Sequence, residues 1–169
     1  MKHVWFGKGE ALFGRLLHVE GGARGGVVIS SGIFQHSGMY EGFARRLESE
    51  GFSVLAYDHR GFGQSHPYAG LSRSQVSSWL DPDVPSLMGD LADAVDFLGE
   101  QMGQPDNVFV WGHSLGGVAG AALATSARCN ARGFILSNPT IHGEFGSAEL
   151  AKEWESKDPD TVVFAQEVR

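Results

Sequence analysis

Four short apolar runs, separated by helical patterns, most constrain the fold of this 169-residue chain. The runs are rich in β-branched and aromatic residues and lie at 27–31, 52–58, 107–111 and 133–138. Helical spacing of apolar residues lies between them, at 40–47, 87–102 and 115–127. Strands without polar alternation, joined by helices, require crossover connections. The sequence therefore predicts an α/β fold with a mostly parallel sheet and helices on both faces.

Three segments differ from this repeating pattern: the two ends of the chain and a long loop in its middle. "VWFG" and "LFGRLLHV" flank a turn-like "KGE", which predicts an antiparallel hairpin of strands at 4–6 and 12–19. A Gly/Pro/Ser-rich loop is expected from Arg60 to about Pro85, and loops of this length are usually functional. Near the carboxyl end, "SAELAKEWESKDP" predicts a surface helix with Leu150 and Trp154 four residues apart.

Composition excludes several classes of function. A formal net charge of −7 without a Lys/Arg cluster disfavours binding to nucleic acid and to anionic lipid surfaces. Cys129 is the only cysteine, so nothing indicates an oxidising compartment. No stretch resembles a signal peptide or approaches the ~20 apolar residues of a transmembrane helix, and a cytoplasmic protein is expected. No spacing of His, Cys, Asp or Glu suggests a metal, and no phosphate loop is present, so no cofactor is expected.

The strand predicted at 107–111 runs directly into Gly112-His113-Ser114-Leu115-Gly116, which matches the pattern G-x-S-x-G. In such a turn the serine hydroxyl projects from the carboxyl end of a strand, and glycines two residues away avoid collisions with the neighbouring strand and helix. A serine that only caps the helix would explain Ser114 but neither glycine. The motif therefore predicts that Ser114 is a catalytic nucleophile.

Acyl transfer also needs two N–H donors for the oxyanion that develops in the transition state. Leu115 follows the serine and supplies one backbone N–H by position. Ile33 follows Gly32 in "SSGIFQHSGMY", directly after the strand at 27–31, and is predicted to supply the other. The same stretch is also compatible with an ordinary Gly-Ser turn that leads into a helix.

Three segments, in order, resemble the serine aminopeptidase and monoacylglycerol lipase-like branch of the α/β-hydrolase superfamily. They are "SSGIFQHSGMYEGFARRLESEGFSVLAYD", "DHRGFGQS" at 58–65 and "GHSLGG" at 112–117, and the resemblance covers roughly residues 10–140. Such proteins usually carry His-Gly where this chain has Ser31-Gly32. That difference leaves the backbone N–H of Ile33 in place but changes a hydrogen bond that braces the loop.

The resemblance also implies an acid and a histidine after later strands, beyond an inserted cap. Residues 1–140 are expected to form the N-terminal part of an α/β-hydrolase core, and 141–169 the start of a cap or lid. No later strand–Asp or strand–His follows, so the fold is expected to be truncated before its last strands. His36 and His142 both remain candidates for the base.

The expected activity is therefore hydrolysis of a carboxylic ester or related acyl bond through an acyl-serine at Ser114, as in esterases and lipases. The alternative is a catalytically incomplete fragment, or a non-catalytic binding protein of the same fold. Either way the expected partner is a small acyl substrate. Its acyl chain, and the choice between ester and amide, are determined largely by the cap.

Overall fold

The computed structural model describes residues 1–65, 84–139 and 162–164. The elements are, in chain order, β1 (Lys2–Phe6), the 3-10 helix η1 (Lys8–Glu10), β2 (Leu12–Leu17), β3 (Gly25–Ser30), the 3-10 helix η2 (Ser37–Tyr40), α1 (Glu41–Ser49), β4 (Phe52–Tyr57), α2 (Val84–Met102), β5 (Val108–His113), α3 (Leu115–Ala124), β6 (Gly133–Ser137) and β7 (Val162–Phe164).

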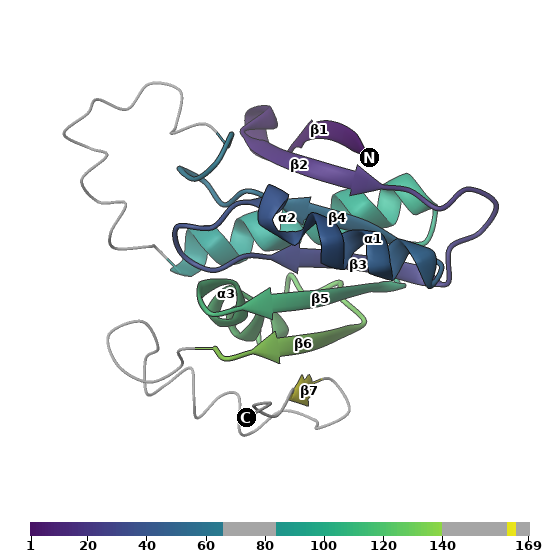
Figure 1. The fold of residues 1–169 in the computed structure, drawn as a ribbon. Helices are drawn as coiled ribbons and strands as arrows, with labels where there is room; N and C mark the ends of the chain where they lie inside the picture. Colours follow the sequence, from purple (N-terminus) through teal and green to yellow (C-terminus); the bar gives the residue numbers. More distant parts are fainter. Residues whose placement is uncertain (66–83, 140–161, 165–169) are drawn as a thin grey trace.

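The strands form a seven-stranded sheet in the order β1-β2-β4-β3-β5-β6-β7 (Figure 1). All pairs from β4 through β3, β5 and β6 to β7 are parallel. The two pairs that involve β2 are antiparallel, and one of them joins β1 and β2 as a hairpin. The predicted α/β class, the mostly parallel sheet and the N-terminal antiparallel hairpin are confirmed.

Helices cover both faces of this sheet, as predicted (Figure 1). On one face, α2 and α3 pack together over the central strands, and their buried side chains belong to the larger hydrophobic cluster. The predicted apolar stripe of α2 lies in this cluster: Leu87, Leu91, Val95 and Leu98. On the other face, α1 packs on β4, and Ala44 joins a smaller cluster with Val27, Ile29 and Val54. Every residue of β3 is buried, which is why the run at 27–31 lacks polar alternation.

Several boundaries differ from those predicted. Strand β5 continues two residues further, to His113, because Gly112 pairs with Leu136 and His113 pairs with Ser137 of β6. Helix α3 ends at Ala124 instead of residue 127. Strand β7 was not predicted at all. The helix expected around Leu150, and the expected cap start at 141–169 apart from β7, lie outside the described residues.

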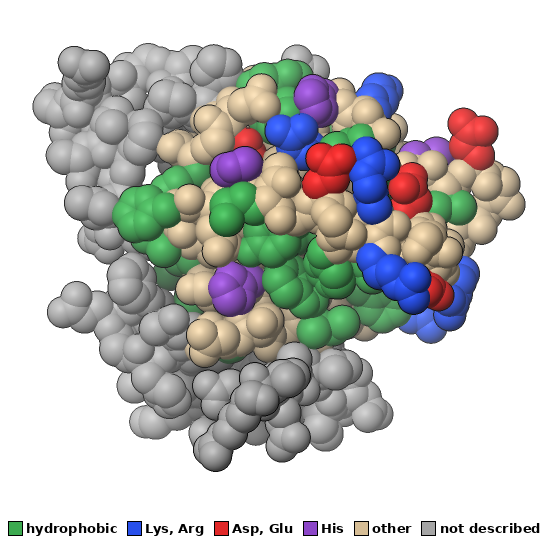
Figure 2. Space-filling view, viewed as in Figure 1, with side chains coloured by type: hydrophobic (Ala, Val, Ile, Leu, Met, Phe, Trp, Pro, Cys, Tyr) green, Lys and Arg blue, Asp and Glu red, His purple; other side chains and the backbone are tan. Residues whose placement is uncertain are grey.

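An open apolar hollow of about 270 Å³ lies beside α1 on the face of the sheet that α1 covers. Hydrophobic side chains gather there in the space-filling view (Figure 2). Phe43 of α1 and Ile135 of β6 are 38% and 37% exposed at its rim, and Trp111 of β5 lies between them in the lining. Within the described ranges, no helix combines the length and the apolar character needed to cross a bilayer.

Candidate functional site

Ser114 is the single residue between the end of β5 and the start of α3. Its backbone has φ 51° and ψ −115°, in the left-handed half of conformational space that side chains other than glycine rarely occupy. Two hydrogen bonds hold this conformation: the Ser114 amide donates to the Ser137 carbonyl (3.0 Å), and its carbonyl accepts from the Val118 amide (3.1 Å). Ser114 therefore occupies the strained strand-to-helix turn that the motif predicts.

The two glycines around Ser114 are required by close packing. A Cβ atom added to Gly116 would lie 2.1 Å from the carbonyl oxygen of Ser30, and one added to Gly112 would lie 2.5 Å from the carbonyl oxygen of Gly116. Such contacts are far shorter than van der Waals distances. The first turn of α3 thus rests directly on the end of β3, and the predicted reason for both glycines is confirmed.

The loop that follows β3 is organised around Gln35. The Gln35 side-chain oxygen accepts from the Gly32 amide (2.8 Å) and from the Tyr40 hydroxyl (2.5 Å), and the Gln35 amide donates to the Gly32 carbonyl (3.2 Å). Ile33 follows Gly32, and no described residue accepts a hydrogen bond from its amide. The same holds for the amide of Leu115, which begins α3.

The end of β3 and the first turn of α3 meet at the carboxyl edge of the sheet. A Cβ atom at Gly116 would lie 2.7 Å from the Ser31 carbonyl oxygen, two residues before Ile33. Ser114, Leu115 and Ile33 therefore belong to segments that are in contact. Their roles as nucleophile and oxyanion donors remain predictions.

The described residues give no base for the Ser114 hydroxyl. Among the described residues, no side chain hydrogen-bonds to it. His36 is exposed at the start of η2, and the His113 ring stacks on Trp111 with 6.1 Å between ring centroids. His142 lies outside the described residues. In the part of the chain that the structure covers, no three His, Cys, Asp or Glu side chains are grouped to hold a metal ion.

The "DHRGFGQS" segment after β4 is a hydrogen-bonded support next to this site. The buried Asp58 carboxylate accepts from the amides of Ser37 (2.6 Å) and Gln64 (2.7 Å). The Ser65 hydroxyl donates to the Asp58 carbonyl (2.5 Å) and accepts from the Phe13 amide (2.9 Å). In the sequence this segment carries part of the family resemblance, and its supporting role becomes visible only in the structure.

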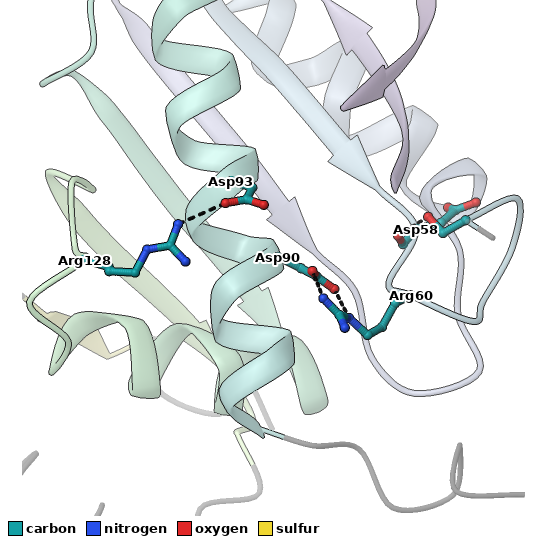
Figure 3. Close-up of polar contacts among 6 residues, drawn as sticks. Asp58, Arg60, Asp90, Asp93 and Arg128 are labelled. Atoms are coloured by element: carbon teal, nitrogen blue, oxygen red, sulfur yellow. Dashed lines mark hydrogen bonds and ion pairs between the residues drawn. The ribbon is translucent and has the colours of Figure 1, made fainter. Parts of the chain in front are cut away.

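Arg60 joins the same segment to α2 through a two-pronged ion pair with Asp90 (Figure 3). Asp90 is only 4% exposed, so this carboxylate lies on the buried side of α2. Burial raises the pKa of Asp90, and the Arg60 guanidinium opposes that rise. A neighbouring pair, Asp93 and Arg128, joins α2 to the segment after α3 (3.0 Å).

His59 is completely buried beneath the loop that follows β3. Its Nε2 lies 2.8 Å from the Ser31 carbonyl oxygen, and since a carbonyl only accepts, Nε2 carries the proton. Nδ1 is then unprotonated and has no partner among the described residues. Burial lowers the pKa of His59 to about 4, and the Ser31 hydrogen bond and the Asp58 charge only partly offset this.

The low pKa of His59 predicts that the protein loses stability in mild acid. Between the ordinary pKa of 6.5 and about 4, the unfolded chain binds a proton at this residue and the folded chain does not, so stability falls as pH falls through that window. We expect a loss of about 2 kcal/mol between pH 7 and pH 5 from this residue. Urea unfolding at both pH values measures it.

The matched control for this prediction is His18, which is exposed. His59→Gln should remove most of the difference in unfolding free energy between pH 7 and pH 5, and His18→Gln should not. Asp58 and Arg60 are the charged neighbours of His59 in the folded protein, and both are unchanged in the two variants. An unchanged difference in His59→Gln would contradict the assignment.

A family model, a sequence relative and a solved structure that are similar to this chain agree with one another. A family model described as "Serine aminopeptidase, S33" matches residues 21–163. Monoglyceride lipase of Homo sapiens is 30% identical over 164 residues, which are 96% of this chain and 50% of that protein. The crystal structure of Paleococcus ferrophilus monoacylglycerol lipase matches with a TM-score of 0.60 and 27% identity, covering 78% of this chain and 44% of that chain.

A further structure is similar in fold alone. A dienelactone hydrolase-like promiscuous phosphotriesterase from metagenomic libraries has a TM-score of 0.70 at 22% identity and covers 97% of this chain and 80% of that chain. By contrast, this chain spans about half the length of the mammalian monoglyceride lipases that it matches, between 47% and 50%.

Proposed function

Because this chain belongs to the serine aminopeptidase S33 family of α/β-hydrolases and is related to monoglyceride lipases and esterases, we propose that it carries the nucleophile and oxyanion-binding amides of a serine ester hydrolase. The observation that carries this proposal is the backbone of Ser114, held at φ 51° between β5 and α3. A strained non-glycine residue is maintained only where surrounding structure enforces it, and such residues cluster at functional sites.

The proposed reaction proceeds in two steps through an acyl-serine. The Ser114 Oγ attacks the ester carbonyl, its proton passes to a base, and the carbonyl oxygen becomes an oxyanion. Collapse of this tetrahedral intermediate breaks the bond to the alcohol oxygen, which takes the proton back from the base and leaves as the neutral alcohol. Water then attacks the acyl-serine in the same way, releasing the carboxylic acid and restoring the Ser114 hydroxyl.

The amides of Leu115 and Ile33 are the proposed donors to that oxyanion. Leu115 begins α3, where an N–H group has no intrahelical acceptor and the helix dipole favours negative charge. In the loop after β3 the Gly32 amide is already used by Gln35, whereas no described residue uses the Ile33 amide. This difference supports Ile33 as the donor from that loop.

The proposed substrate is a small acyl ester, and the relatives named as monoglyceride lipases make a monoacylglycerol the first candidate. We further propose that residues 1–140 form the N-terminal part of the catalytic core and that 141–169 begin a cap over it, apart from β7 at 162–164, which pairs with β6 in the sheet. The base and the acid would then come from outside the described residues.

Ester preference is tested by comparing an acyl ester with the matching anilide. A version of this chain extended to the length of its relatives should hydrolyse p-nitrophenyl butyrate and a monoacylglycerol, and should hydrolyse the butyryl anilide far more slowly. Ser114→Ala should remove the activity, whereas Ser49→Ala, which changes an exposed serine of α1, should not. Anilide hydrolysis at the ester rate would contradict the ester assignment.

One observation favours a second candidate, a non-catalytic protein that retains the binding site. Among the described residues, no histidine reaches the Ser114 hydroxyl, and a serine without a base is a poor nucleophile at neutral pH. Under this alternative the chain would bind an acyl compound without turning it over. Saturable binding of a monoacylglycerol, unaffected by Ser114→Ala and without hydrolysis even in the extended protein, would favour it.

A further inference from the structure

The segment after β4 holds both ends of the loop that carries Ile33. At the start of this loop, the His59 Nε2–H donates to the Ser31 carbonyl (2.8 Å). At its end, the Asp58 carboxylate accepts from the Ser37 amide (2.6 Å). His59 and Asp58 are adjacent in sequence, and both are buried, at 0% and 2% exposure. Two neighbouring side chains thus span a loop of seven residues, 31–37.

We propose that Asp58 and His59 form a clamp that sets the direction of the Ile33 N–H bond, and that His59 is therefore a positioning residue for the oxyanion site. This inference rests on the proposed role of Ile33 as an oxyanion donor. The two side chains do not contact the reacting atoms. They act through the backbone of residues 31–37.

The orientation follows from the two peptide units between Ser31 and Ile33. In the first unit, the Ser31 carbonyl accepts from His59 and the Gly32 amide donates to Gln35, so both of its polar groups are held. In the second, the Gly32 carbonyl accepts from the Gln35 amide (3.2 Å). A trans peptide is planar, with its C=O and N–H pointing in opposite directions. The Ile33 N–H therefore points away from Gln35.

The clamp is itself fixed to the body of the protein. The second Asp58 oxygen accepts from the Gln64 amide (2.7 Å), and Ser65 joins the segment to β2 through the Phe13 amide. Arg60 pairs with Asp90 of α2, so an ion pair also joins the segment to this helix (Figure 3). Because these bonds restrain Asp58 and His59, displacement of the 31–37 loop would have to break several of them.

The Ser31 side chain does not hold the start of the 31–37 loop, so this role is left to His59. Ser31 is fully buried, and its hydroxyl has no partner among the described residues, so it cannot brace the loop. The backbone carbonyl of Ser31 is braced instead, by a ring that burial keeps neutral and able to donate from Nε2 at physiological pH.

Two substitutions of His59 separate its hydrogen bond from its packing. His59→Gln keeps an N–H donor near the position of Nε2, whereas His59→Phe keeps a ring of similar size and removes the donor. His18→Phe is the matched control, because it makes the same change at an exposed histidine that lies outside the clamp. Tyr57 is unsuitable as a control, since its hydroxyl contacts Ser30 Oγ (3.3 Å), which in turn lies 3.5 Å from His59 Nε2.

The first measurement is NMR of the 169-residue chain at pH 7, which does not depend on activity. Nitrogen shifts should show His59 as the neutral tautomer protonated at Nε2. The amide resonances of Gly32 and Ile33 should move in His59→Phe, return towards the original positions in His59→Gln, and stay in place in His18→Phe. An Nδ1-protonated ring, or unmoved amides in a folded His59→Phe protein, would overturn the proposal.

The second measurement is the rate at which a fluorophosphonate labels Ser114. Misplacing one oxyanion donor should lower this rate on the order of tenfold or more in His59→Phe, with recovery in His59→Gln. If the amides move but the labelling rate stays unchanged, the clamp exists but Ile33 is not an oxyanion donor. If Ser114 is labelled neither in the 169-residue chain nor in the extended protein, the proposed function fails, and the NMR result alone decides the clamp.

Discussion

Gly116→Val should destabilise the protein by about 3 kcal/mol or more, at the upper end of what overpacking a close contact costs. The first added carbon alone would lie 2.1 Å from the Ser30 carbonyl oxygen and 2.5 Å from the Ser30 carbonyl carbon. Both atoms belong to the backbone of β3, which lies in the middle of the sheet and is buried at every position. Relief therefore requires α3 to move away from the sheet. Urea or thermal unfolding measures the loss.

A glycine on an open helix surface provides the control. A Cβ atom at Gly42 of α1 would meet nothing within 4 Å, and the residue is exposed. Gly42→Ala should therefore be neutral or stabilising by up to ~1 kcal/mol, because alanine favours the helix. If Gly116→Val unfolds at the same midpoint as the parent chain, α3 does not pack on β3 in the way described.

The 169-residue chain alone should hydrolyse p-nitrophenyl butyrate barely above the background rate. No histidine among the described residues contacts the Ser114 hydroxyl, so no described group accepts its proton. In serine hydrolases, loss of this partner removes most of the catalysis and leaves about 10³–10⁴-fold over water from the oxyanion site and substrate binding. At micromolar protein and millimolar ester, such a rate is of the same order as spontaneous ester hydrolysis.

A protein extended by later strands that carry an acid and a histidine should differ from the short chain by orders of magnitude. It should turn over the ester and lose that activity with Ser114→Ala. Robust, Ser114-dependent turnover by the 169-residue chain would contradict this expectation. His36→Ala and His142→Ala would then identify the base.

Much of the fold could be predicted because it depends on local patterns. The largely apolar runs at 27–31 and 52–58 indicated strands buried on both faces. The stripe from Leu87 to Leu98 indicated which side of α2 packs on the sheet. Strand β7 was missed because "TVVF" is a short β-branched run inside a polar segment that resembled the start of a cap. Its pairing with β6 is a long-range contact that local spacing does not reveal.

The candidate site likewise has a part that local sequence patterns predict and a part that they do not. Ser114 and its two glycines were predicted because the motif and its place between a strand and a helix are both visible in the sequence. The supporting contacts were not, because they join residues far apart: His59 contacts Ser31, 28 positions away, and Arg60 contacts Asp90, 30 positions away. Asp90 carried a partial signal, since it is close to Leu87 and Leu91 on the helix and can share their buried side.

The central claim, that Ser114 is the residue that attacks an acyl or phosphonyl centre, is tested most directly by fluorophosphonate labelling followed by mass spectrometry. The 169-residue chain and its Ser114→Ala variant would be incubated with the probe until labelling is complete, and the modified residue identified by peptide mapping. We predict one slowly formed adduct on Ser114 that is absent from the variant. An adduct on another residue, equal labelling of the variant, or no Ser114 adduct in a protein extended by later strands that carry an acid and a histidine would contradict the claim.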